Sequence, residues 1–418
     1  MKAANSLLCC LAFAARAGLS AQEATPAHGG PEVVHTVYLE YQEADRGLVS
    51  WVFLVPLQNA RFSKEPDFGR RRVCRGSLRL GSEPEDAVPF AWDPGQAKLY
   101  LDLNRNGDLT DDPNGVFSAR SRSDQTFTNL HIEFKTRIGT RRLLADLSLY
   151  QTGLRWGNRL MVTLACHSFW AAKVLLQGQE WQVGLVENLA GQTPRRNGTI
   201  EVGLGRLGSA EDGYLLLRPW ESRNQPFNLQ DGSLDGFNFR RDLFIGHQAY
   251  QVDWAYDQHD GAPGFKLELR ECFAALGELR LTGRFIQRLV LTGTPNPPAA
   301  GPFTVVLDRP EPTVRIPVGS YSQCRIQLEA GGAQACRLEQ ASPVMPVGPS
   351  NAAVLTAGGP LTNTVRIVPD EGSLSLTYQL VGAEGALYQL LHQDRRHPPS
   401  WVVYRKGEAI DTGWFRFG

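Results

Sequence analysis

The sequence predicts a mainly β, multi-domain protein built from antiparallel sheets. Short runs rich in β-branched and aromatic residues recur along the chain, and few segments keep a helical period. Gly, Pro and Asn turn signals separate these runs, which favours sandwiches or barrels over a parallel α/β sheet. At 418 residues the chain is long for a single core, so several domains are expected.

Five strand-like runs come first along the chain. They alternate apolar and polar residues or are apolar throughout, and they span residues 33–41, 48–57, 76–80, 98–103 and 127–134. A polar, glycine-containing stretch then covers residues 151–158. We therefore expect an N-terminal β-domain over residues 33–155 and a second β-rich domain over residues 156–290.

Two segments of the second domain resemble each other. Gly178-Gln-Glu-Trp181-Gln-Val183 and Gly246-His-Gln-Ala-Tyr250-Gln-Val252 each follow an apolar triplet. Both indicate a hairpin in which a glycine turn returns an aromatic strand.

The clearest break in the chain is the proline-rich stretch LTGTPNPPAAGP at residues 291–302. Closely spaced prolines stiffen a linker and remove backbone donors from a sheet. The short strand-like runs that follow fit an immunoglobulin-like sandwich. We expect residues 303–418 to form this separate C-terminal β-sandwich.

The N-terminus has the organisation of a secretory signal peptide. Lys2 precedes an apolar run from Leu7 to Ala15, and small residues follow it. We expect residues 1–21 to be removed on export, which makes the mature chain secreted or periplasmic. No later segment offers about 18 unbroken apolar residues, so no membrane span is expected after cleavage.

Charge and cysteine content bear on the kind of partner and on disulfide pairing. The 43 basic and 43 acidic residues balance, so a nucleic-acid partner is not expected. Five cysteines follow the signal peptide, an odd number for a chain in an oxidising compartment. Cys324 and Cys336 flank a Gly-Gly turn; they either face each other across a hairpin or are two buried thiols.

The strongest chemical signal is the stretch DLNRNGDLTDD. Asp102, Asn104 and Asn106 place side-chain oxygens at its first, third and fifth positions, where they converge when the chain curls around a hard cation. Gly107 holds the sixth position, where the sharp turn favours a residue without Cβ. This pattern predicts a calcium loop.

The second half of the loop departs from a standard EF-hand. Asp108 is expected to contribute its backbone carbonyl at the seventh position, and Leu109 to anchor the loop to a core. The twelfth position is Pro113 instead of glutamate. Asp111 or Asp112 must then close the shell early. Because Pro113 opposes an immediate helix, we expect a loop between strands without a helix pair.

The loop resembles the dockerin and EF-hand-like loops of exported bacterial proteins. The pattern Asp102-x-Asn104-x-Asn106-Gly107-x-x-x-Asp111-Asp112 carries this resemblance, which covers residues 102–112. In that class such loops mostly brace a fold or a module junction. The alternative is an Asx-rich turn without metal. Mutual repulsion between the clustered aspartates favours calcium.

The sequence contains no local catalytic signature. HExxH and GxSxG are missing, and Cys166 and His167 are neighbours that a strand directs to opposite faces. The first interpretation is therefore an exported, calcium-binding β-protein, a non-catalytic binding or structural module whose partner is a protein or glycan at the cell envelope. The rival is a secreted carbohydrate-active enzyme whose catalytic carboxylates no local motif marks.

Overall fold

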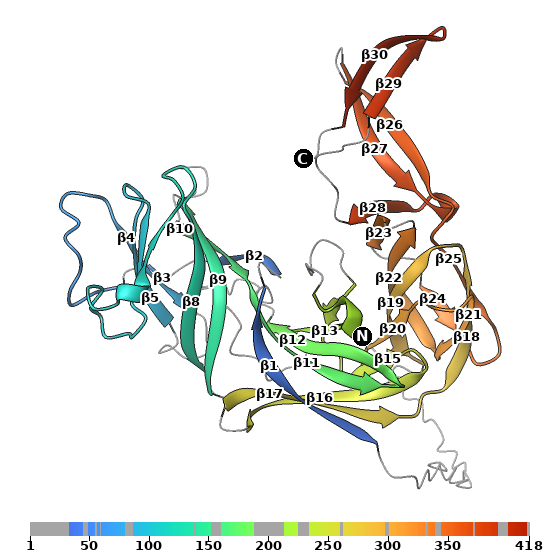
Figure 1. Ribbon diagram of the computed structural model, residues 1–418, viewed down its shortest axis with the longest axis horizontal. Helices are drawn as coiled ribbons and strands as arrows, with labels where there is room; N and C mark the ends of the chain where they lie inside the picture. Colours follow the sequence, from blue (N-terminus) through green and yellow to red (C-terminus); the bar gives the residue numbers. More distant parts are fainter. Residues whose placement is uncertain are drawn as a thin grey trace, which may run out of the picture. The chain divides into compact units, whose positions relative to one another are not determined.

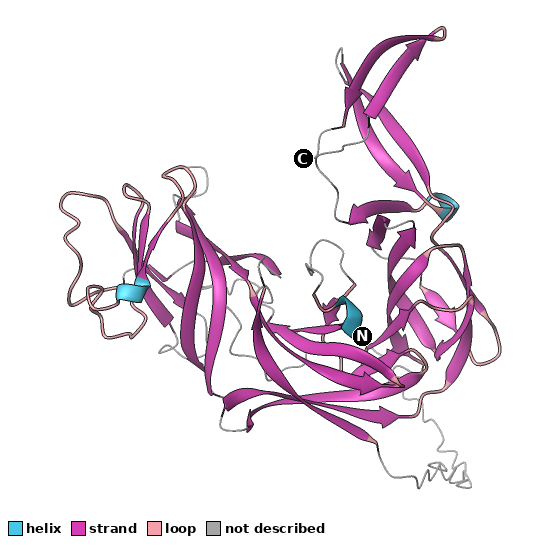
Figure 2. Ribbon diagram, in the orientation of Figure 1, coloured by secondary structure: helices cyan, strands magenta, loops and turns pink. Residues whose placement is uncertain are grey.

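The computed structural model describes residues 33–415, except 45–48, 55–56, 59, 80–86, 137–138, 152–159, 188–212, 225–233, 260–261, 297–300, 331–332, 339–343, 371–372 and 392–399. Within them the chain forms thirty β-strands and three short 3-10 helices, without an α-helix (Figure 2). Nearly all strand pairs are antiparallel, so the mainly β prediction is confirmed. The expected signal peptide, residues 1–21, lies outside the described residues.

Residues 49–166, here the loop module, form two sheets around one core (Figure 1). The first sheet has the order β2-β10-β9-β8 and the second β3-β4-β5-β6-β7. Their strands are β2 (Val49–Leu54), β3 (Leu57–Gln58), β4 (Cys74–Arg79), β5 (Ala87–Asp93), β6 (Lys98–Leu101), β7 (Val116–Ser118), β8 (Thr126–Thr136), β9 (Gly139–Gln151) and β10 (Leu160–Cys166).

Strand β5 is buried on both faces. Its alternate residues Val88, Phe90 and Trp92 enter the core between the two sheets. Ala91 points the other way, into a smaller cluster with Leu109 of the predicted calcium loop. Because side chains alternate between the two faces of a strand, β5 contacts the module core on one face and the loop residue Leu109 on the other.

Strand β1 (Val34–Glu43) lies in a central sheet, between β11 and β17. That sheet runs β14-β13-β12-β11-β1-β17-β16-β15. Its other strands are β11 (Ser168–Leu176), β12 (Gln179–Glu187), β13 (Gly213–Pro219), β14 (Gly236–Asn238), β15 (Asp242–Ile245), β16 (Gln248–His259) and β17 (Ala262–Cys272). β1 belongs to this sheet, whereas β10 pairs with β9 and β2 of the loop module. The domain division at residues 155 and 156 stays a prediction.

The two predicted glycine hairpins are present and lie against each other. β11 turns into β12 at Gln177 and Gly178, and β15 turns into β16 at Gly246, all three with positive φ. The Gln177 side chain donates to the Ile245 carbonyl at 2.6 Å. A Cβ on Gly246 would lie 2.8 Å from Gln177 Oε1, the end of a side chain that can shift, so the positive φ of +59° is what favours glycine here.

The sheet continues through β15-β20-β19-β22-β23-β28-β27-β26, and β21-β18-β25 form a second sheet beside it. The strands are β18 (Leu276–Thr282), β19 (Ile286–Pro295), β20 (Phe303–Asp308), β21 (Thr313–Pro317), β22 (Gly319–Ala330), β23 (Ala333–Leu338), β24 (Met345–Val347), β25 (Ala353–Thr356), β26 (Thr362–Asp370), β27 (Ser373–Val381) and β28 (Leu387–Leu391). Residues of both sheets share one core.

The expected domain boundary before residue 303 stays a prediction, but strands on either side of it are paired. β19 runs into the proline-rich stretch as far as Pro295 and pairs with β20, so the rest of the stretch connects the two strands of a hairpin. Leu289 before the stretch and Leu291 at its start share a core with Val305 and Leu307 after it. Local sequence did not indicate the pairing of the strands on either side of the stretch. Two sheets around one core are present here, and an immunoglobulin-like order stays a prediction.

The remaining elements lie outside these cores. β29 (Ser400–Arg405) and β30 (Glu408–Trp414) pair only with each other among the described strands. The 3-10 helices are η2 (Pro113–Gly115), η5 (Trp220–Ser222) and η6 (Ala383–Gly385).

The backbones of Cys324 and Cys336 are not directly opposite each other. In the pairing of β22 with β23, Cys336 is opposite Gln327, three residues along the strand from Cys324.

Candidate metal centre

The predicted calcium loop connects β6 to η2. Asp102 follows the last residue of β6, and Pro113 is the first residue of η2. Proline suits this position because its fixed φ fits the first turn and its missing N–H leaves no donor unpaired. η2 leads directly into β7 (Val116–Ser118), so the loop lies between two strands as expected, and the described residues around it contain no helix pair.

Asp102 lies at the base of the loop with 1% of its surface exposed. Its backbone N–H donates to the Pro89 carbonyl of β5 at 2.9 Å. Its carboxylate accepts from the backbone N–H groups of Asn106 at 3.2 Å and Gly107 at 3.0 Å. The first ligand position is therefore buried and directed into the loop.

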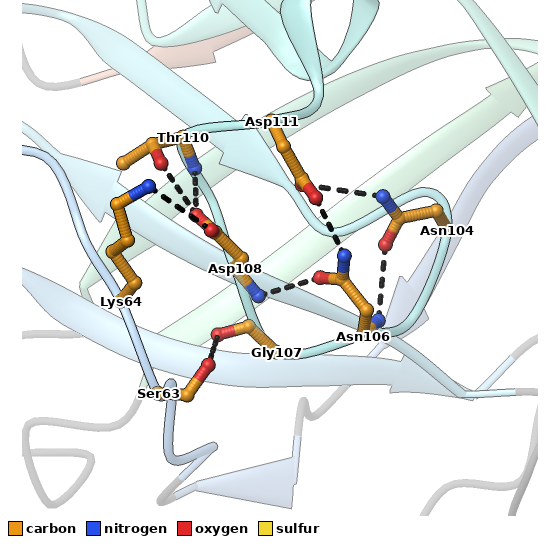
Figure 3. A network of polar contacts seen from close by, with 8 residues as sticks. All are labelled: Ser63, Lys64, Asn104, Asn106, Gly107, Asp108, Thr110 and Asp111. Atoms are coloured by element: carbon orange, nitrogen blue, oxygen red, sulfur yellow. Dashed lines mark hydrogen bonds and ion pairs between the residues drawn. The ribbon is translucent and has the colours of Figure 1, made fainter.

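Asn104, Asn106 and Asp111 face one another across the loop (Figure 3). The Asp111 carboxylate accepts from Asn104 Nδ2 at 3.2 Å and from Asn106 Nδ2 at 2.6 Å. Two amide groups thus donate hydrogen bonds to this carboxylate, in the position where a bound cation would contact it. Because amide oxygen and nitrogen occupy nearly the same volume, a 180° rotation of each amide would present oxygen instead.

Asp112 completes the group of buried acids, with 9% exposure. Its Oδ2 accepts from the Leu103 N–H at 3.1 Å. Burial raises the pKa of this carboxyl, and the negative charges of Asp102 and Asp111 raise it further against the opposing backbone hydrogen bonds. The inner side of the loop is thus an electronegative position that a cation would stabilise.

Asp108 is directed away from its neighbouring acids. Its carboxylate contacts Lys64 Nζ at 3.2 Å and accepts from the Thr110 N–H at 2.8 Å. Hydrogen bonds from the Thr110 hydroxyl and N–H, followed by the Lys64 contact, lower the pKa of Asp108. This orientation suits a residue whose expected contribution is its backbone carbonyl.

The segment before β4 holds the turn of the loop in place. Gly107 has φ +80°, and its carbonyl accepts from Ser63 N at 2.8 Å and Ser63 Oγ at 3.0 Å (Figure 3). The Leu109 N–H donates to the Lys64 carbonyl at 3.1 Å. Sequence reasoning missed Ser63 and Lys64, because the segment around them has neither a strand period nor a motif.

Two further contacts anchor the loop. Leu109 is 2% exposed and packs in the small cluster that contains Phe68 and Tyr100, as expected for the eighth position. Arg105 has φ +61° and donates to the carbonyls of Leu103 at 3.2 Å and of Glu133 in β8 at 2.7 Å. The loop therefore contacts both sheets of its module.

The donor set decides which metal could bind. Among the described residues no three His, Cys, Asp or Glu side chains form a metal-binding group. Asp102, Asp111 and Asp112 are therefore not gathered as three ligands, and a complete shell would need their carboxylates to draw together with the Asn104 and Asn106 amides and a carbonyl. An all-oxygen set of mixed charge suits calcium and lacks the nitrogen or sulfur ligands of zinc sites.

The Cys166–His167 pair does not form a nucleophile and base. Cys166 is buried in the loop-module core, with Sγ 3.3 Å from the Ser168 carbonyl. His167 Nε2 lies 3.2 Å from Asp146 Oδ2, and Nδ1 lies 3.3 Å from the Ala44 carbonyl. The Nε2 contact has an ion-pair distance without hydrogen-bond alignment. The two side chains thus occupy different environments.

Comparison with models of protein families, with curated proteins and with solved structures found no match to this chain. In the part of the chain that the structure describes, no helix has the length and hydropathy needed to cross a membrane.

Proposed function

We propose that this chain is an exported, calcium-binding β-protein that acts as a non-catalytic binding or structural module of the cell envelope. The observation that supports it is the loop at residues 102–112. Two of its acids, Asp102 and Asp112, are buried, and Asp111 is held by two amide side chains. Burying carboxylates together is costly unless a counter-charge accompanies them, and calcium supplies that charge.

The role assigned to calcium is structural. The loop contacts β5 through Asp102, β8 through Arg105, and the segment at Ser63. A cation that fixes the loop would therefore stabilise both sheets of the loop module. No helix pair flanks the site, so the opening movement of a calcium sensor is not expected.

Calorimetry tests the proposed site directly. The full chain, stripped with chelator, should bind one calcium ion and bind magnesium more weakly, because magnesium demands tighter octahedral geometry. Asp102→Ala should abolish binding. Asp108→Asn is the matched variant and should retain calcium, since its side chain is directed to Lys64 and Thr110. Binding that is lost in Asp108→Asn and kept in Asp102→Ala would contradict the assignment.

The rival interpretation is a secreted carbohydrate-active enzyme. Glycoside hydrolysis needs two carboxyl groups about 5–10 Å apart in a groove. A cleft of the loop module lined by Trp92 and Tyr150 has Asp124 as its one carboxylate. At that place the geometry supports ligand binding over hydrolysis.

A further inference from the structure

A cleft of about 410 Å³ lies where the two sheets of the loop module meet. Its volume falls within the range of about 300–1,000 Å³ that is usual for small-molecule sites. β5 and the turn after it contribute Trp92 and Pro94. The connection between β7 and β8 contributes Arg122 and Asp124, and β9 contributes Tyr150.

The walls of the cleft are fixed by hydrogen bonds through Gln125. Trp92 Nε1 donates to Gln125 Oε1 at 2.9 Å, which connects β5 to the β7–β8 connection. Gln125 Nε2 donates to the Arg122 carbonyl at 2.9 Å, and the Leu149 N–H donates to the Gln125 carbonyl at 3.1 Å. The cleft is therefore formed before any ligand arrives, which lowers the entropic cost of binding.

The lining combines an aromatic ring with polar groups of both kinds. Tyr150 is 39% exposed and lines the cleft together with Thr126 and Ser148, whose hydroxyl oxygens are 2.8 Å apart. Arg122 supplies donors, and Asp124 supplies acceptors. One exposed tyrosine on a strand needs no functional explanation by itself. Here the ring borders a cleft lined by donors and acceptors.

The charges of the side chains that line the cleft indicate whether it favours a charged or a neutral ligand. Arg122 and Asp124 have opposite charges, so the cleft offers no net charge to attract an anion or a cation. A ligand that fits must present an apolar face to the Tyr150 ring and hydroxyl groups to the polar side chains. A pyranose ring has both, because its C–H bonds form the face and its hydroxyls the edge.

We propose that this cleft binds a neutral saccharide. The proposal names a ligand class for the binding role proposed above, and it depends on that role but not on calcium. Tyr150 stacks on the sugar ring, and Asp124 and Arg122 hydrogen-bond its hydroxyls. With one carboxylate in the cleft, the saccharide is held and not cleaved.

The test uses the full chain in saturating calcium and four defined probes: cellohexaose, xylohexaose, mannohexaose and laminarihexaose. Titration calorimetry should detect binding of at least one probe. Tyr150→Ala should weaken that binding by about tenfold, or about 1.4 kcal/mol. Asp124→Asn should also weaken it. Tyr404→Ala is the matched control, because Tyr404 is 65% exposed on β29, outside the cleft, and should leave binding unchanged.

Each result decides the proposal. It is overturned if none of the four probes binds, or if the probe that binds does so equally well in Tyr150→Ala. Melting curves of each variant verify that it is folded, which is expected since Tyr150 and Asp124 are exposed. Repeating the saccharide titration in chelator shows whether the cleft works without calcium. Saccharide binding by a chain that binds no calcium in calorimetry would retain the cleft and reject the metal site.

Discussion

At the scale of single residues, the loop at residues 102–112 shows what a pattern can and cannot predict. The pattern correctly predicted a sharp turn at Gly107 and a buried plug at Leu109, because backbone sterics and hydropathy act locally. Ser63 and Lys64 contact the loop from more than forty residues away in the chain. No local signal records that approach, so sequence alone could not supply them. The cleft at Tyr150 was missed for the same reason.

Gly107 provides the first prediction. At φ +80° a Cβ has room, with its nearest neighbour 3.6 Å away, so the cost of Gly107→Ala is backbone strain of about 1 kcal/mol. The variant should also bind calcium more weakly, because the turn positions the ligands. Gly69→Ala is the control, at φ +56° with open space around it. It should lose similar stability in urea denaturation and bind calcium like the parent. Equal calcium affinity in both variants would count against the loop.

Asp308 provides a prediction about pH. Burial raises the pKa of this carboxyl above its ordinary value of 3.8, against the attraction of Arg288 and Arg309. The folded state therefore holds the proton more tightly than the unfolded state. The free energy of unfolding should fall as the pH rises from 3.8 through the raised pKa of the folded state. Asp308→Asn should remove this fall, measured by urea denaturation across that range. Parallel pH profiles for parent and variant would contradict the assignment.

At the scale of elements, strands were predictable and their partners were not. The runs at 98–103 and 127–134 overlap β6 and β8. The two similar segments that begin at Gly178 and Gly246 form the predicted hairpins. Period-2 alternation and turn residues are local properties, so they can be recognised in sequence. β1 pairs with β17, more than two hundred residues later, and the proline-rich stretch joins two paired strands. Such pairings depend on tertiary packing, which is why local sequence could not supply them.

Buried arginines connect elements that backbone pairing leaves apart. Arg288 of β19 donates to Asp235, before β14, at 3.1 Å and to the Leu217 carbonyl of β13. Arg288 is 3% exposed, and its guanidinium also lies over the Trp181 ring at 5.8 Å. In the strand order β13 and β19 are far apart, so these contacts join distant parts of one sheet.

Arg288→Met should therefore destabilise the protein strongly. The variant leaves the Leu217 carbonyl without this donor and Asp235 paired with Arg218, at a cost of about 1–3 kcal/mol. Arg309→Met is the control, since Arg309 and its partner Glu221 have side chains 66% and 64% exposed. It should cost less than about 1 kcal/mol. Denaturation in urea measures both values, and similar losses in the two variants would show that burial of the pair is unimportant.

At the scale of the whole molecule, stability should be distributed unevenly. β16 and β17 carry Val252, Leu267 and Leu269, all fully buried. The hairpin β29–β30 exposes large apolar side chains, including 65% of Trp414, and a two-stranded sheet alone is marginal in water. Amide hydrogen exchange should therefore be much faster in β29–β30 than in β16–β17. Equal protection would show that β29–β30 is covered in solution.

The central claim is that calcium stabilises this protein through the loop at residues 102–112, and thermal unfolding with calcium and with chelator tests it most directly. A ligand held only by the folded state adds about 2.7 kcal/mol at a hundred times its Kd, so calcium should raise the Tm of the parent. Asp102→Ala should lose this gain, and Asp411→Ala, which removes an exposed acid from β30, should keep it. The same Tm for the parent in calcium and in chelator would contradict the claim and leave the loop a polar turn.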